Sequence, residues 1–232
     1  MSLKLSEQEQ VRRESLQKLR DLGINPYPAD LFPVDTLTKD LKTKFEEGKM
    51  VTMAGRLMSR RIMGKASFAE IQDAEGKIQV YFNRDEICTG EDKTMYNDVF
   101  KKLLDIGDFV GFTGELFITK VGEQSVKIKS FTLLSKSLKP LPLPKTDADG
   151  NVHDAFTDPE LRYRQRYVDL VVNPGVKDVF IKRTKLFNAM RTFFNEKGYF
   201  EVETPILQPI AGGAAAKPFI THHNTLDIPL YL

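Results

Sequence analysis

The stretch Ala66-Ser-Phe-Ala-Glu-Ile-Gln-Asp-Ala-Glu-Gly-Lys-Ile-Gln-Val-Tyr-Phe-Asn83 decides the fold of this 232-residue chain. Apolar residues alternate with others through 66–72 and again through 77–83, and the turn formers Asp73 to Gly76 stand between the two runs. This period of two is typical of strands that bury one face. The stretch therefore predicts two strands joined by a tight turn.

Three further runs of the same period predict strands at about 50–60, 109–119 and 125–134. Between the third and fourth strands, Tyr96, Val99, Phe100 and Leu103 fall at helical spacing, and Gly107 lies beyond them. Five strands with one helix between the third and fourth is the layout of an OB-fold. The sequence thus predicts an all-β Greek-key barrel over about 50–135, a fold that commonly binds oligonucleotides on its second and third strands.

The outer face of those two strands carries residues suited to unpaired bases. If the two strands pair so that the apolar residues of both lie on one buried face, then Phe68, Lys77, Gln79 and Tyr81 share the opposite, outer face. Aromatic rings stack on bases and amides bind base edges. Arg60 and Arg61, at the end of the first strand, would add phosphate or base contacts. An ordinary exposed face with one stray phenylalanine accounts for this pattern equally well.

Composition excludes several classes of protein. The net charge of +2 does not by itself indicate a nucleic-acid binder, and no stretch approaches the ~20 apolar residues of a membrane span. A cytoplasmic protein with no membrane partner is the default expectation. The single cysteine, Cys88, rules out an intramolecular disulfide and a zinc site built from cysteines. His222 and His223 are adjacent, so on a strand they face opposite ways, and we expect no metal site in this chain.

Helices and a linker flank the predicted barrel. Ser6 and Glu9 form a capping-box pattern that begins a surface helix ending at Gly23, which either packs on its own domain or contacts RNA. Leu37, Leu41 and Phe45 mark a short second helix. Prolines and polar residues over 138–151 predict an extended linker. A helix opens at Asp158-Pro159, a longer one runs from near Pro174 to Gly198, and a strand is predicted over 199–207.

The stretch Phe194-Asn-Glu-Lys-Gly198-Tyr-Phe-Glu-Val-Glu-Thr-Pro205-Ile-Leu resembles the first signature motif of class II aminoacyl-tRNA synthetases. In that family a long helix, a glycine and a strand with a fixed proline form the dimer interface. The resemblance implies a homodimer in which Gly198 and Pro205 belong to the interface. A proline at an edge strand or a special junction is physically reasonable, because proline lacks the donor that an interior strand needs.

Three further segments resemble the lysyl-tRNA synthetases of this class: 56–68, Leu161-Arg-Tyr-Arg-Gln-Arg-Tyr-Val-Asp-Leu170, and 209–224. The likeness covers nearly the whole chain. Aspartyl and asparaginyl enzymes share the barrel and the first motif, but the Gly212-Gly213-Ala-Ala-Ala loop and the following Thr-His-His-Asn look specific to the lysine enzymes. The rival interpretations are an aspartyl or asparaginyl enzyme and a non-catalytic RNA-binding OB-fold protein.

The resemblance implies roles for particular residues. Phe68 would stack on an anticodon base of tRNA-Lys and Gln79 would hydrogen-bond the central uridine, with Arg60 beside them and Glu115 also at the anticodon. Gly212 and Gly213 would line the lysine pocket, where the lack of side chains lets the backbone approach the amino acid.

The resemblance also implies an organisation and a reaction. Residues 1–145 would bind the anticodon, 146–157 would form a linker, and 158–232 would begin an α+β catalytic domain with an antiparallel sheet. The intact enzyme would use ATP and Mg²⁺ to form lysyl-adenylate and then charge tRNA-Lys. The second and third class II motifs, which bind ATP and magnesium, do not occur in the 232 residues. We therefore expect no catalytic or metal-binding residues here and no activity from this chain alone.

Overall fold

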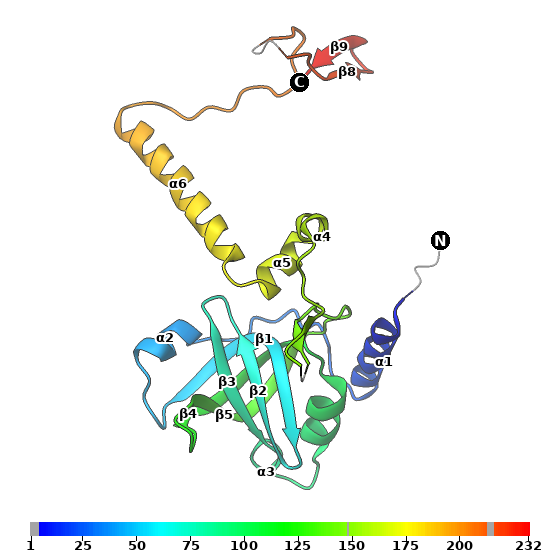
Figure 1. Ribbon diagram of the computed structural model, residues 1–232, viewed down its shortest axis with the longest axis vertical. Coiled ribbons are helices and arrows are strands. Elements are labelled where there is room, and N and C mark those ends of the chain that lie inside the picture. Colours follow the sequence, from blue (N-terminus) through cyan, green and yellow to red (C-terminus); the bar gives the residue numbers. More distant parts are fainter. Residues whose placement is uncertain (1–4, 148, 213–215) are drawn as a thin grey trace. The chain divides into compact units, whose positions relative to one another are not determined.

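A computed structural model describes residues 5–147, 149–212 and 216–232 of the chain. The chain divides into two compact units, Met1–Arg162 and Tyr163–Leu232, each with its own internal contacts. The first unit contains the barrel and the second contains a long helix and a small sheet (Figure 1). Among the described residues, no helix has the length and apolar character needed to cross a membrane.

Five strands close into the predicted barrel. They are β1 (Met50–Met63), β2 (Ala66–Gln72), β3 (Lys77–Asn83), β4 (Phe109–Ile118) and β5 (Gln124–Ser135). The strand order is β1-β2-β3-β5-β4 with β4 returning to β1, and only the β3–β5 pair is parallel among these neighbours. This is the expected OB-fold, and the predicted limits of β2 and β3 are confirmed. Closure leaves no unpaired sheet edge.

The barrel interior is filled by apolar side chains of all five strands, including Val51, Met53, Ile71, Val80, Phe82, Phe112, Leu116, Val126 and Ile128. Burying one such side chain contributes roughly 1.5–3 kcal/mol. The segment between β3 and β4 holds a short helix α3 (Arg84–Ile87) and the longer helix η1 (Met95–Leu103). All four residues of the predicted apolar stripe of η1 are buried, and its Phe100 ring stacks on Phe82 with centroids 4.0 Å apart.

Helix η1 differs from the expected α-helix in its hydrogen bonds. It is a π-helix, and the N–H of Leu104 at its end donates to the carbonyl of Val99, five residues earlier. π-type turns are rare and are often found at functional sites. Here the helix lies beside the end of β1 and the start of β2, where it contacts Arg60, Gly64 and Ser67.

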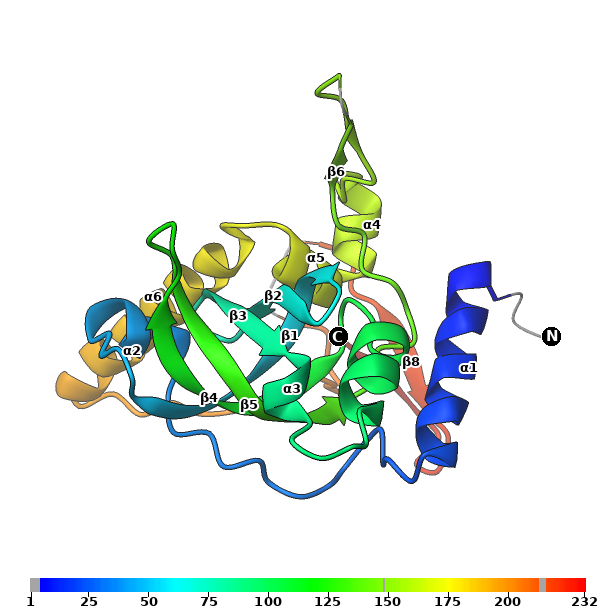
Figure 2. The same cartoon turned by 90° about the horizontal axis from the view of Figure 1, so that it is seen from below.

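Helix α1 (Glu7–Asp21) begins at Ser6 with the predicted capping box. It lies beside η1 in both views (Figures 1 and 2). Its buried face consists of Arg12, Ser15 and Leu19, while Val11 is 51% exposed. The Arg12 guanidinium donates to the carbonyls of Ile106, Ser137 and Lys139. Helix α1 therefore packs on its own domain, through the fully buried Leu19 and through the hydrogen bonds of Arg12. Helix α2 (Thr38–Thr43) follows it.

Within the segment expected as a linker, β6 (Lys145–Thr146) and β7 (Val152–His153) form a small hairpin. Asp147 stabilises its turn by accepting from the N–H groups of Asp149 and Asn151. Helix α4 (Pro159–Arg164) is capped by Asp158, whose carboxylate accepts from the N–H of Leu161. The expected cap at Asp158-Pro159 is thus confirmed.

The second unit contains α5 (Arg166–Val172), α6 (Val176–Glu196) and an antiparallel pair, β8 (Ile220–His223) and β9 (Ile228–Tyr231). The strand predicted over 199–207 is wrong, because residues 199–205 are irregular and only Gln208 forms a bridge, to Tyr231. A strand requires a hydrogen-bonded neighbour. Residues 199–205 lie beside no other strand among the described residues of this unit.

Candidate nucleic-acid interface

The outer side of β2 and β3 forms as their alternation predicts. The directly opposed pairs are Phe68 with Tyr81, Glu70 with Gln79, and Gln72 with Lys77. These side chains are partly or fully exposed, and the residues between them in each strand are buried. The predicted grouping of Phe68, Lys77, Gln79 and Tyr81 on one face is therefore confirmed.

The same side of the barrel continues across β1, β5 and β4. Arg61 lies opposite Phe68, Lys127 lies opposite both Tyr81 and Glu115, and Ser125 lies opposite both Gln79 and Phe117. Residues opposed in neighbouring strands project to the same side of a sheet. We call the resulting surface the aromatic face, and it consists of Arg61, Phe68, Gln79, Tyr81, Glu115, Phe117 and Lys127.

Three rings form the centre of the aromatic face. The centroids of Phe68 and Tyr81 are 5.1 Å apart with their planes at 53°, and those of Tyr81 and Phe117 are 6.0 Å apart with their planes at 64°. Tilted and edge-to-face pairs at these distances attract one another, so each ring helps to hold its neighbour. All three rings remain partly exposed. Partly exposed rings on a barrel surface are platforms on which bases can stack.

Gln79 supplies the amide of the aromatic face. Within the described part of the chain its side chain makes no hydrogen bond, although Glu70 lies directly opposite and is itself paired with Lys77 at 2.7 Å. An amide carries both donors and an acceptor. The Gln79 side chain is therefore available to bind the edge of a base.

The two adjacent arginines of β1 project to different sides. The guanidinium carbon of Arg61 is 5.7 Å from the centroid of the Phe68 ring, on the aromatic face. Arg60 instead lies opposite the buried Ala69, donates to the carbonyl of Phe100 in η1 and lies over the Phe100 ring. Burial lowers the pKa of Arg60, but an arginine stays charged at neutral pH. The structure thus brings Arg61, and not Arg60, together with Phe68 and Gln79.

A group of charges borders the aromatic face on β4 and β5. The Lys129 amine is 2.6 Å from one carboxylate oxygen of Glu86 and 3.7 Å from Glu115, and the Lys127 amine is 3.4 Å from the other oxygen of Glu86. Burial opposes the ionisation of Glu86, but the hydrogen bond from Lys129 and the charge of Lys127 outweigh it and lower its pKa. Glu86 therefore holds both lysines beside Glu115, the residue expected at the anticodon.

Two sets of hydrogen bonds fix the strands that carry the aromatic face. Ser67, next to Phe68, is fully buried, and its hydroxyl is 2.8 Å from the Tyr96 hydroxyl of η1. In the turn between β2 and β3, the Asp73 carboxylate accepts from the N–H groups of Thr38, Glu75 and Gly76. Burial raises the pKa of Asp73, but these hydrogen bonds prevail and hold it below its ordinary value. The turn and the start of β2 are therefore both anchored.

Gly114 allows β4 and β5 to approach closely next to Glu115. A Cβ at this position would lie 2.5 Å from the carbonyl oxygen of Lys127, and the pairing of the two strands shifts between Thr113 and Gly114. Only glycine fits where backbones approach this closely. Phe117 and Lys127 were not among the residues expected from the sequence. Their place on the aromatic face depends on the β4–β5 register and on the β3–β5 register, the second of which joins segments distant in the chain.

The residues expected at a dimer interface lie in the second unit. Gly198 ends α6 with a left-handed φ of +82°, a conformation that favours glycine. Pro205 is exposed, and its carbonyl accepts from the Gln208 side chain at 3.3 Å. No residue of α6 is buried. Its exposed large apolar residues include Val179, Phe180, Leu186, Phe187, Met190, Phe193 and Phe194.

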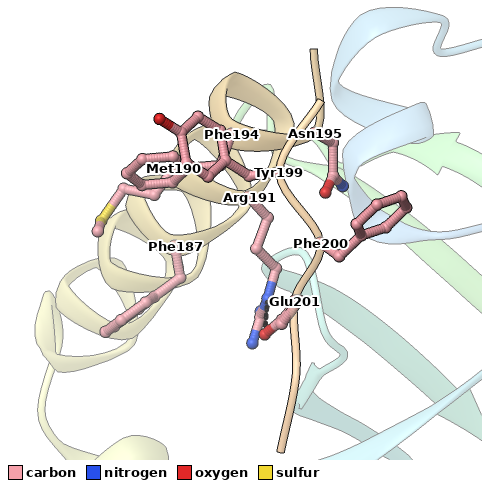
Figure 3. A pocket seen from close by; sticks show the side chains of 8 residues that line it. All are labelled: Phe187, Met190, Arg191, Phe194, Asn195, Tyr199, Phe200 and Glu201. Carbon is pink, nitrogen blue, oxygen red and sulfur yellow. Dashed lines mark hydrogen bonds and ion pairs between the residues drawn. The ribbon is translucent and has the colours of Figure 1, made fainter. Parts of the chain in front are cut away.

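A hollow of about 450 Å³ lies at the end of α6 (Figure 3). Its lining residues are Phe187, Met190, Arg191, Phe194, Asn195, Tyr199, Phe200 and Glu201. The Arg191 Nε is 3.0 Å from a carboxylate oxygen of Glu201, the only ion pair that the figure draws among them. The Phe194 and Tyr199 rings pack with centroids 5.6 Å apart. The hollow is thus largely aromatic and apolar.

Of the two glycines expected in a lysine pocket, Gly212 is exposed, and a Cβ there would meet no atom within 4 Å. Gly213 lies outside the described residues. His222 and His223 lie on β8, where His222 is 3.2 Å from Asp227 and His223 accepts from the N–H of Leu226. In the part of the chain that the structure describes, no group of three or more His, Cys, Asp or Glu side chains could hold a metal ion. Cys88 is buried.

Comparisons with known proteins agree with this architecture. Residues 51–134 match the family of OB-fold nucleic acid binding domains, and residues 158–232 match the class II tRNA synthetases of the D, K and N type. The barrel with its aromatic face and the segment that follows thus define part of a class II tRNA synthetase.

Individual relatives show which synthetases of this class the chain resembles most strongly in sequence. The chain is 74% identical over 228 residues to a lysine–tRNA ligase of Christiangramia forsetii, and it is 61% identical over 235 residues to one of Porphyromonas gingivalis. A lysine–tRNA ligase of Azobacteroides pseudotrichonymphae is 58% identical over 231 residues. These matches cover 98%, 99% and 98% of the chain and 40%, 40% and 46% of the relatives. The chain belongs to the lysine–tRNA ligase family and spans less than half the length of these members.

Proposed function

We propose that the aromatic face binds the anticodon of tRNA-Lys. Phe68 stacks on one base, the Gln79 amide binds the edge of the central uridine, and Arg61 contacts the phosphate or base next to the Phe68 ring. The observation that supports this most is the continuity of the face, which places rings, an unpaired amide and cations side by side. Single-stranded RNA is recognised by this combination of stacking, edge hydrogen bonds and charge.

Arg60 and Glu115 have different places in this proposal. Arg60 supports the aromatic face from the other side of β1, because its side chain donates to the carbonyl of Phe100 in η1. Glu115 lies on the aromatic face at the β4 edge of the proposed site, where a carboxylate can accept from a base amino or imino group. The resemblance to the family supports a role for both residues at the anticodon.

We further propose that the whole protein is a cytoplasmic ligase that joins lysine to tRNA-Lys at the expense of ATP, with Mg²⁺. The names of the relatives support this reaction. Among the described residues there is no group of three or more His, Cys, Asp or Glu side chains that could hold a metal ion. Their part in the reaction is to bind and orient the tRNA, and Gly212 and Gly213 are proposed to line the lysine pocket.

The second unit supports a homodimer. The exposed apolar side of α6, the aromatic hollow at its end and the turn at Gly198 together form a surface that water solvates poorly. Contiguous apolar surface of this kind marks a protein–protein interface. We propose, as the resemblance to the class II synthetases implies, that a second copy of the protein covers part of this surface, with Gly198 and Pro205 at the contact.

Binding to RNA stem-loops tests the anticodon proposal. The chain is titrated with a stem-loop bearing UUU and with one bearing GUC, at fixed moderate salt, because phosphate contacts alone give affinity that is blind to sequence. We expect the wild-type chain to bind the UUU stem-loop more tightly than the GUC stem-loop. We expect Phe68→Leu and Gln79→Ala to reduce this difference in affinity. Loss of one base stack costs roughly 1–3 kcal/mol. Phe109→Leu, which removes a ring near the start of β4, is the control. Equal binding of the two loops by a folded chain would refute the proposal.

A further inference from the structure

The chain is held to the barrel where it leaves β5. The Lys136 amine is 2.9 Å from one carboxylate oxygen of Asp108 and also binds Asp105, and the Ser137 N–H donates to the other oxygen of Asp108 at 2.7 Å. The side chains of Lys136 and Asp108 are fully buried, so solvent and salt screen this ion pair little. We call residues 136–139 the linker root, because the chain passes through them from the barrel toward the second unit.

Arg12 of α1 binds the backbone of the linker root. Its guanidinium donates to the carbonyls of Ser137 at 3.0 Å and Lys139 at 3.3 Å, and to the carbonyl of Ile106, just before β4, at 2.9 Å. Arg12 itself is only 7% exposed. The planar guanidinium presents five N–H donors in a fixed arrangement, which a lysine amine does not. One side chain thus joins α1, the linker root and the segment before β4.

The extended run after α1 binds the linker root as well. The Tyr27 hydroxyl donates to the Lys136 carbonyl at 3.0 Å, and the Lys136 N–H donates to the Pro26 carbonyl at 3.2 Å. Beyond the linker root the sequence continues as Pro140-Leu-Pro-Leu-Pro144, and its three prolines have no N–H with which to form such bonds. The bonds from the N-terminal segments therefore fall on the last residues before a segment with few backbone donors.

From these contacts we infer that Arg12 is a positioning residue, which fixes the linker root on the barrel and so sets the direction in which the chain leaves it. For its consequence the inference rests on the proposed function. If the barrel holds the anticodon while the catalytic domain charges the tRNA, a fixed exit limits the orientations in which the bound tRNA meets that domain. Reactions gain rate when such freedom is removed beforehand. The competing explanation is that Arg12 only stabilises the fold of the first unit.

Amide hydrogen exchange of the 232-residue chain separates the two explanations. Arg12→Leu removes the three bonds, and Arg13→Leu, whose guanidinium donates to the Glu9 carbonyl within α1, is the matched control. We expect exchange of the linker-root amides to become about 10-fold faster or more in Arg12→Leu, with exchange in β2 and β3 and affinity for the UUU stem-loop unchanged. Tyr27→Phe, which loses one bond, should raise the same exchange rates less, and it serves if Arg12→Leu does not fold. Unchanged exchange at the linker root, or an equal rise throughout the barrel, overturns the inference.

The full-length ligase tests the consequence for charging. Three activities are measured for the wild type, Arg12→Leu, Arg12→Lys and Arg13→Leu: lysine-dependent pyrophosphate exchange without tRNA, charging of an RNA that has only the acceptor stem, and charging of whole tRNA-Lys. We expect Arg12→Leu to lower kcat for whole tRNA-Lys roughly 10-fold or more and to leave the other two activities unchanged, because only whole tRNA is presented by the barrel. Arg12→Lys, which keeps one charged donor group, should recover part of the loss. Equal losses in all three assays, or none in any, overturn this role of Arg12. If the wild type does not charge tRNA-Lys, the proposed function itself has failed.

Discussion

Arg61 lies over the ring of Phe68, with its guanidinium carbon 5.7 Å from the ring centroid. Its neighbour Arg60 projects to the other side of β1 and donates to the carbonyl of Phe100. The pairing of β1 with β2 shifts between Leu57 and Ser59, just before the two arginines. Arg61 thus belongs to the aromatic face, and Arg60 supports η1.

The two arginines should respond differently to substitution. Arg61→Gln is expected to weaken binding of the UUU stem-loop about 5-fold, because it loses a cation beside the stacked base, with little change in stability. Arg60→Gln is expected to lower the free energy of unfolding by about 1–3 kcal/mol, because it leaves a buried carbonyl unpaired. Urea unfolding and RNA titration measure both effects. A stable Arg60→Gln chain with lost RNA binding would instead make Arg60 a direct contact.

Gly114→Ala tests the close approach of β4 and β5. A methyl group there meets the Lys127 carbonyl at 2.5 Å, so the strands must separate. Overpacking of this kind costs about 1–3 kcal/mol. RNA affinity should fall as well, because Glu115 and Lys127 flank the site. Gly90→Ala is the control, since a Cβ there meets nothing within 4 Å. Equal melting temperatures for the two variants would contradict the prediction.

Acid should loosen the turn between β2 and β3. The pKa of Asp73 is held below its ordinary value of 3.8, because hydrogen bonds to its carboxylate outweigh the effect of burial. A depressed carboxyl pKa stabilises the fold above the ordinary value, and that contribution is lost as pH falls through the folded-state pKa.

We therefore expect Asp73→Asn to be less stable than the wild type near neutral pH and to lose less stability on acidification. Urea unfolding measured between about pH 6 and pH 3 checks this. Asp30→Asn, at an exposed position, is the control. Parallel stability–pH curves for Asp73→Asn and the wild type would show that the turn does not depend on the charge.

Local sequence patterns predicted the strands and helix faces that depend on residues close together in the chain. The alternation in 66–83 predicted β2, β3 and their exposed side, and the spacing of Tyr96, Val99, Phe100 and Leu103 predicted the buried side of η1. Features that depend on distant pairing could not be predicted in this way. The β3–β5 register, which brings Lys127 beside Tyr81, joins strands far apart in the chain.

The strand predicted over 199–207 and the directions of Arg60 and Arg61 both depend on a partner strand. Alternation alone suggested a strand over 199–207, but a strand forms only with a hydrogen-bonded neighbour. Arg60 and Arg61 are adjacent in the sequence, but neighbouring residues of a strand point to opposite sides, so Arg61 shares the side of Phe68 while Arg60 contacts η1. In both cases the side chains were interpreted without the partner strand that determines their place.

The contact between Ser67 and Tyr96 provides the last prediction. Both residues are fully buried, and their hydroxyl oxygens are 2.8 Å apart, while the Tyr96 hydroxyl also donates to the Gly64 carbonyl at 3.3 Å. Tyr96→Phe should cost about 1–3 kcal/mol, because it leaves the Ser67 hydroxyl buried without this partner. Ser67→Ala should cost less, because Tyr96 keeps its bond to Gly64.

The double variant should be more stable than the sum of the two single losses implies, because it removes both partners of one hydrogen bond. Urea unfolding of the wild type, the two single variants and the double variant gives the coupling free energy between the two hydroxyls, expected at about 1 kcal/mol. RNA titration of the same chains shows whether the contact also orients Phe68, the residue next to Ser67. Strictly additive losses would mean that the two hydroxyls do not bond in solution, and that packing of the Tyr96 ring, rather than its hydroxyl, holds η1 against β2.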